Sequence, residues 1–74
     1  DPMLVTVEPN DKPITLNSHE GQEWCHVIEG RLLIKIGDKE KELEVGDSIM
    51  FDSTCEHGMK ALDGKTVKFI TVIS

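Results

Sequence analysis

Hydrophobic and polar residues alternate along most of the chain, and a period of two is the pattern of β-strands. Short runs rich in Val, Ile, Leu and Thr are separated by turn pairs such as Gly37-Asp38, Gly46-Asp47 and Asp63-Gly64. The pattern predicts an all-β domain of about eight short strands, over residues 3–7, 13–16, 23–29, 31–36, 40–45, 48–51, 57–62 and 66–73. This rhythm is typical of a small antiparallel jelly roll or barrel.

Two of these segments indicate what their outer faces contact. Segment 40–45 alternates glutamates with Leu43 and Val45, so we expect one face of that strand to be solvated. In segment 23–29, Trp24, His26 and Ile28 lie on the face opposite Glu23. A bulky row on so small a domain suits burial against a second copy of the chain, so we expect a homodimer.

Length and charge limit the partners. The chain has 74 residues, enough for one domain near the lower limit for an independent core. Its 14 acidic residues outnumber 8 basic ones, and no basic stripe is present, so this chain alone is not expected to bind DNA or an anionic membrane. No apolar run approaches the ~18 residues of a membrane span. Because no apolar leader is present either, we expect a cytoplasmic protein.

Three residues could form a metal site. His19 and Glu23 are four residues apart, so their side chains would share one face of an extended segment, and His57 could join them from a distant turn. Two histidines and one carboxylate are the ligands of a facial iron triad or a zinc site. The alternative is that they are hydrogen-bonded polar residues at strand ends. Phe51 and Met59 flank His57 and are predicted to line a ligand pocket or the core.

The two cysteines are too few for a disulfide framework. We expect both Cys25 and Cys55 to be reduced, partly buried thiols. Cys55 lies two residues before His57, so it could instead act as a soft ligand for zinc or copper, or as a redox-sensitive thiol.

Residues 21–73 resemble the conserved-barrel cupins. In the run EWCHVIEG, Glu23 and Gly30 have the spacing of the first cupin motif, and His19 stands at its second histidine. Asn17 occupies the place of the first histidine. Gly46 and His57 fit the second motif, although three of its other positions have changed: Asp52 for proline, Thr54 for glycine and Ala61 for asparagine. The resemblance implies a cupin barrel and a divalent metal (Zn, Fe, Mn or Ni) at His19, Glu23 and His57.

The strings HEGQEW, IEGRL, GDSIMFDST and HGMKAL are also similar to the cupin domain that follows a helix-turn-helix in XRE-type bacterial regulators. That resemblance implies a ligand-sensing and dimerisation domain, residues 1–74, excised from a longer chain whose missing N-terminal domain binds DNA. The absence of a methionine at Asp1 agrees with such an excision. The alternatives are a stand-alone metal-dependent enzyme of the dioxygenase or isomerase type, and a plain ligand-storage or structural cupin. We favour the sensor, because the sequence offers few further acids or bases beside the three candidate ligands.

Overall fold

A computed structural model describes all residues from 1 to 74, and it contains seven β-strands and no helix. The strands are β1 (Met3–Val7), β2 (Gln22–Glu29), β3 (Leu32–Ile36), β4 (Lys39–Leu43), β5 (Ser48–Asp52), β6 (His57–Ala61) and β7 (Val67–Ile73). The all-β prediction is confirmed. The strand predicted over residues 13–16 is wrong, since this segment forms no ladder and only Asn17 makes an isolated bridge, to His57.

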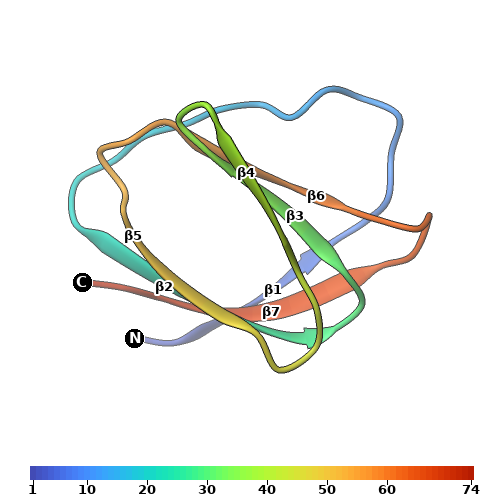
Figure 1. Ribbon diagram of the computed structural model, residues 1–74. Coiled ribbons are helices and arrows are strands. Elements are labelled where there is room, and N and C mark those ends of the chain that lie inside the picture. Colours follow the sequence, from blue (N-terminus) through green and yellow to red (C-terminus); the bar gives the residue numbers. More distant parts are fainter.

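The strands form two antiparallel sheets that face each other (Figure 1). One sheet has the order β1-β7-β2-β5, and the other has the order β4-β3-β6. Every neighbouring pair is antiparallel, and the edge strand β1 pairs with the last strand, β7. This arrangement is the small jelly-roll barrel that the turn rhythm predicts.

The core lies between the sheets and follows from the alternation of side chains. Inward positions of β2, β3 and β7 supply its most buried members. They pack with residues of β4, β5 and β6 into one cluster: Cys25, Val27, Leu32, Ile34, Leu43, Phe51, Ala61, Val67 and Phe69. Four polar residues are buried as well: Glu23, Ser53, His57 and Thr71. Buried polar side chains need partners, so they mark a candidate site inside the fold.

The covering segment, which connects β1 and β2, lies along the free edge of β6, and a glycine allows its close approach. A Cβ atom on Gly58 would lie 2.3 Å from Ile14 Cγ2 and 2.5 Å from the Thr15 carbonyl oxygen. Two residues further on, Asn17 and His57 exchange backbone hydrogen bonds of 2.9 and 2.8 Å. The covering segment therefore holds the first residue of β6 in place.

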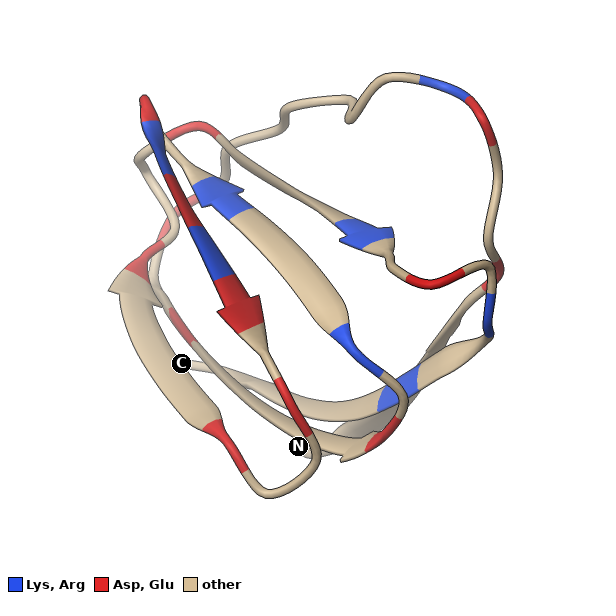
Figure 2. Ribbon diagram, turned by 45° about the vertical axis from the view of Figure 1, so that its right-hand side comes forward, with Lys and Arg blue, Asp and Glu red and all other residues tan.

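The outer faces carry different chemistry. Lysines and glutamates alternate along β4, as the blue and red segments in Figure 2 show, and these four residues are exposed. The solvated face expected there is present, but Val45 lies beyond the strand and is 61% exposed. On the four-stranded sheet, Trp24 and His26 stack on the outer face at a centroid distance of 5.7 Å. The predicted apolar row thus lies outside, and its role in a homodimer stays a prediction.

The fold has no helix with the length and hydrophobicity that a membrane span requires.

Candidate metal centre

The fold brings His19, Glu23 and His57 together inside the barrel. Glu23 projects inward from β2, His57 begins β6 in the opposite sheet, and His19 lies in the segment that precedes β2. Glu23 Oε1 lies 3.3 Å from His19 Nε2 and 3.5 Å from His57 Nε2. One candidate ligand atom from each residue lies within 4.8 Å of the other two. The structure therefore brings all three predicted residues into one cluster.

Backbone contacts orient both imidazole rings. His57 Nδ1 lies 2.9 Å from the Cys55 carbonyl oxygen, and His19 Nδ1 lies 3.2 Å from the Glu20 carbonyl oxygen. A carbonyl can only accept a hydrogen bond, so each ring carries its proton on Nδ1. In the neutral rings, Nε2 is then a lone pair that faces Glu23. Metal-bound histidines commonly have this arrangement, in which the other ring nitrogen donates to a backbone carbonyl.

The site therefore gathers three acceptors with no donor between them. Two imidazole lone pairs face one carboxylate oxygen, and this arrangement is repulsive unless a proton or a cation lies among them. Bonds of about 2.1 Å to a metal place neighbouring ligands about 3.0 to 3.4 Å apart for octahedral or tetrahedral angles. The separations of 3.3 and 3.5 Å are close to this range. The charge of the group and the two distances to Glu23 thus fit a divalent cation.

Burial differs among the three residues. The side chains of Glu23 and His57 are 8% exposed, whereas the His19 side chain is 38% exposed. His19 is fixed from behind, because its backbone N–H donates to the Ser53 carbonyl oxygen at 2.9 Å. The His57 ring makes edge contacts with His19 at 5.2 Å and with Phe51 at 4.9 Å between centroids. His19 therefore forms the solvent-side wall of the site.

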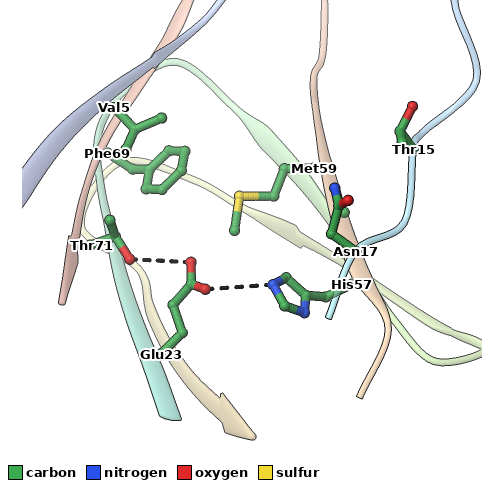
Figure 3. A pocket seen from close by; sticks show the side chains of 9 residues that line it. Val5, Thr15, Asn17, Glu23, His57, Met59, Phe69 and Thr71 are labelled. Atoms are coloured by element: carbon green, nitrogen blue, oxygen red, sulfur yellow. Dashed lines mark hydrogen bonds and ion pairs between the residues drawn. The ribbon is translucent and has the colours of Figure 1, made fainter. Parts of the chain in front are cut away.

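A cavity of about 360 Å³ opens onto this site. Glu23, His57 and Thr71 form its floor, Val5, Met59 and Phe69 form an apolar wall, and Thr15 and Asn17 lie on the covering segment (Figure 3). Gly58 completes the lining. Met59 is one of the lining residues, and its role in ligand binding stays a prediction. Phe51 packs against His57 and is not one of the lining residues.

The cysteines differ from each other. Both are free, but Cys25 is fully buried, whereas Cys55 is exposed and not partly buried as expected. Burial is the main reason that the pKa of Cys25 rises to about 12. The Cys55 thiol is not in the cluster of candidate ligands, to which this residue contributes only its carbonyl contact with His57.

Sequence reasoning did not identify Thr71. Its hydroxyl donates to Glu23 Oε2 at 3.2 Å, as Figure 3 shows, and the residue is 3% exposed. A usable indication was present in the strand pattern, since Thr71 is the polar member of the inward row that contains Val67 and Phe69. A polar residue in a buried row needs a partner, which here is the carboxylate.

Residues 3–73 match the family model described as Cupin domain (Cupin_2). The chain belongs to the cupin domain family. The comparison with curated proteins gives no significant match.

Solved structures of one cupin enzyme resemble the chain over nearly its whole length. Fe(II) HppE in complex with substrate is 32% identical with a TM-score of 0.88, over 99% of this chain and 44% of that one. Hydroxypropylphosphonic acid epoxidase from S. wedmorenis in complex with fosfomycin gives 32% and 0.88, over 99% and 42%. Co(II) HppE in complex with substrate gives 33% and 0.87, over 99% and 43%. The chain thus spans less than half the length of these structures.

These comparisons correct one expectation. The prediction of a ligand-sensing domain from a transcriptional regulator is contradicted, because the similar structures are those of a metal-containing epoxidase. The resemblance to XRE-type regulators had rested on short strings around turns. Such strings preserve the barrel's turn geometry, and different functions can share that geometry. The expectation of a divalent metal agrees with the Fe(II) and Co(II) in the similar structures and with the cluster described above.

Proposed function

We propose that this domain is the metal-dependent catalytic domain of an enzyme that acts on a small organic molecule. In this proposal His19, Glu23 and His57 hold one divalent metal ion, and the substrate occupies the adjoining cavity. The observation that carries it is the convergence of two imidazole lone pairs on a buried carboxylate oxygen, at 3.3 and 3.5 Å. A group of acceptors alone is stable only around a cation or a proton.

Three protein ligands of the type 2-His-1-carboxylate leave positions open for other molecules, as in non-haem iron enzymes. When bound, the metal supplies Lewis acidity and, in the case of iron, one-electron chemistry. The protein fixes the ligand geometry through the carbonyl contacts of His19 and His57. Glu23 supplies the one negative charge among the three ligands, so the site keeps a net positive charge toward the cavity.

The cavity lining supports a small substrate with an apolar part. Val5 and Phe69 from one sheet and Met59 from the other provide apolar contact, whereas Asn17 and Thr15 lie on the covering segment (Figure 3). Pockets that bind small molecules usually combine an apolar lining with a few polar groups that fix orientation. The similar structures with substrate or fosfomycin bound support this use of the fold.

A metal titration tests the ligand set. Wild-type protein titrated anaerobically with Fe(II) or Co(II) should bind one ion per chain. His57→Ala should bind at least about 100-fold more weakly, because it loses a ligand, which costs more than the 10–100-fold of an outer-shell change. His26→Ala is the matched control, since His26 lies on the outer face, where Ser48 Oγ is 2.6 Å from its Nδ1. Equal binding by the wild type and His57→Ala would contradict the proposal.

A turnover assay tests the enzyme class. Iron-loaded protein supplied with an oxidant, either hydrogen peroxide or dioxygen with a reductant, should convert a small hydroxylated substrate. Hydroxypropylphosphonic acid is the first probe, because the similar epoxidase is named for it; closing its epoxide ring removes two hydrogens, which the oxidant accepts. Products are followed by mass spectrometry, and His26→Ala should retain the turnover that His57→Ala loses. Stoichiometric metal binding without turnover of this probe or of neutral hydroxylated analogues would contradict an enzymatic role and indicate a structural metal.

A further inference from the structure

The two oxygens of Glu23 have separate sets of partners. Oε1 faces the two candidate histidine ligands, His19 and His57. Oε2 points the other way, where it accepts from Thr71 Oγ1 at 3.2 Å and lies 3.4 Å from Cys25 Sγ. The carboxylate is thus fixed through Oε2, and Oε1 is left to face the two histidines.

The partners of Oε2 belong to the rigid part of the fold. Cys25 and Thr71 are directly opposite each other in the pairing of β2 with β7, and their side-chain atoms lie 3.7 Å apart. Cys25 is fully buried and Thr71 is 3% exposed, so water does not replace their contacts with the carboxylate. Buried hydrogen bonds to a charged oxygen are short-range and directional. The orientation of the Glu23 carboxylate is therefore set by two strands of one sheet.

We propose that Thr71, assisted by Cys25, holds Glu23 as a ligand through one oxygen only. This inference rests on the proposed metal centre. A carboxylate can bind a metal through one or both oxygens, and a second bound oxygen occupies one more coordination position. With Oε2 engaged by the Thr71 hydroxyl, Glu23 takes a single position. Thr71 is thus a positioning residue that keeps a further position open for the substrate or a co-reactant.

Two substitutions at one position separate this role from a purely structural one. Thr71→Val keeps the shape but removes the hydroxyl, so Oε2 keeps only the weaker contact with the Cys25 thiol and becomes able to bind the metal. Thr71→Ser keeps a hydroxyl on the same strand position and should behave like the wild type. If Thr71→Val does not fold, Cys25→Ala provides a second variant that weakens the same anchor, with Cys25→Ser as its control.

The measurement is the visible absorption spectrum and affinity of the Co(II)-loaded protein, because the d–d bands of Co(II) weaken as its coordination number rises. We expect weaker bands per Co(II) in Thr71→Val, a 10–100-fold change in Co(II) affinity, and wild-type behaviour in Thr71→Ser. An unchanged spectrum in Thr71→Val, with or without an affinity change, would overturn the positioning role. The same altered spectrum in Thr71→Ser would also overturn it. Failure of the wild type to bind Co(II) would instead overturn the proposed metal centre.

Discussion

Gly58→Ala should loosen the covering segment from β6 and weaken the metal centre at the same time. The new Cβ would lie 2.5 Å from the Thr15 carbonyl oxygen, and real Cβ contacts are essentially never shorter than 3.0 Å. The backbone at Thr15 must therefore retreat by at least 0.5 Å, the difference between these two values. The contact with Ile14 Cγ2 at 2.3 Å is easier to relieve, because a side chain can rotate.

The size of the effect follows from overpacking, which typically costs about 1–3 kcal/mol. For a domain of this length each kcal/mol lowers the melting temperature by roughly 4–8 °C. We therefore expect Gly58→Ala to melt about 5–20 °C below the wild type. The displacement also reaches the metal centre, since Asn17 and His57 exchange two backbone hydrogen bonds only two residues from Thr15. Co(II) affinity should fall as well.

Thermal unfolding is followed by far-ultraviolet circular dichroism and by the fluorescence of Trp24, the only tryptophan. The control is Gly37→Ala, whose Cβ meets nothing within 4 Å; unlike Gly58, Gly37 has a left-handed φ of 61°, so this variant carries backbone strain without a clash. It should lose some stability and keep its Co(II) affinity. A Gly58→Ala protein that melts with the wild type, or that keeps wild-type Co(II) affinity, would refute the reasoning.

Four further predictions concern the thiols, a surface ion pair and the outer face. A thiol reagent should modify exposed Cys55 at once and Cys25 only on unfolding; equally fast reaction of both would contradict the burial of Cys25. Because burial raises the pKa of Cys25 from 9.0 to about 12, metal-free stability should fall as pH rises through that interval, and Cys25→Ala should lack this component. Arg31 lowers the pKa of Asp63 below 3.8, so the wild type should lose part of its stability as pH falls through that lowered pKa. Asp63→Asn should lack this pH-dependent contribution, which denaturation series at several pH values would measure. Met50→Glu, on the outer face beside the apolar row, should convert a dimer to a monomer in sedimentation velocity; a monomeric wild type would end the dimer prediction.

Local pattern was sufficient for most strands, but it could not show which strands pair. Segments such as Val67–Ile73 are rich in β-branched residues and end at turn residues, so their conformation is encoded nearby. Segment 13–16 has a similar composition, yet it lies across Gly58 without a ladder. The conformation of this segment depends on its contact with a glycine more than forty residues away, and the local sequence cannot predict such a contact. The pairing of β1 with β7 is long-range for the same reason.

The sequence predicted the three residues of the candidate site, but the structure brings His19 to Glu23 in a different way from the one expected. His19 and Glu23 were expected to share a face of one extended segment, but His19 precedes β2 and is held by the Ser53 carbonyl. The distance of His57 along the chain did not show that it would lie beside the other two residues. The resemblance to the cupin motifs supplied that prediction. Thr71 was missed because its role depends on the pairing of β2 with β7. Chemistry that arises from neighbouring strands appears only once their register is known.

The candidate ligands belong to different sheets, with Glu23 on β2 and His57 on β6. An ion held by both would tie the two layers of the barrel together and act as a reversible cross-link in a domain with a small core. Free metal at 100 times its dissociation constant adds about 2.7 kcal/mol to the folded state. Cellular proteases degrade the opened form, so the lifetime of this protein in a cell would depend on the metal supply. Metal scarcity would then reduce the amount of protein as well as its activity.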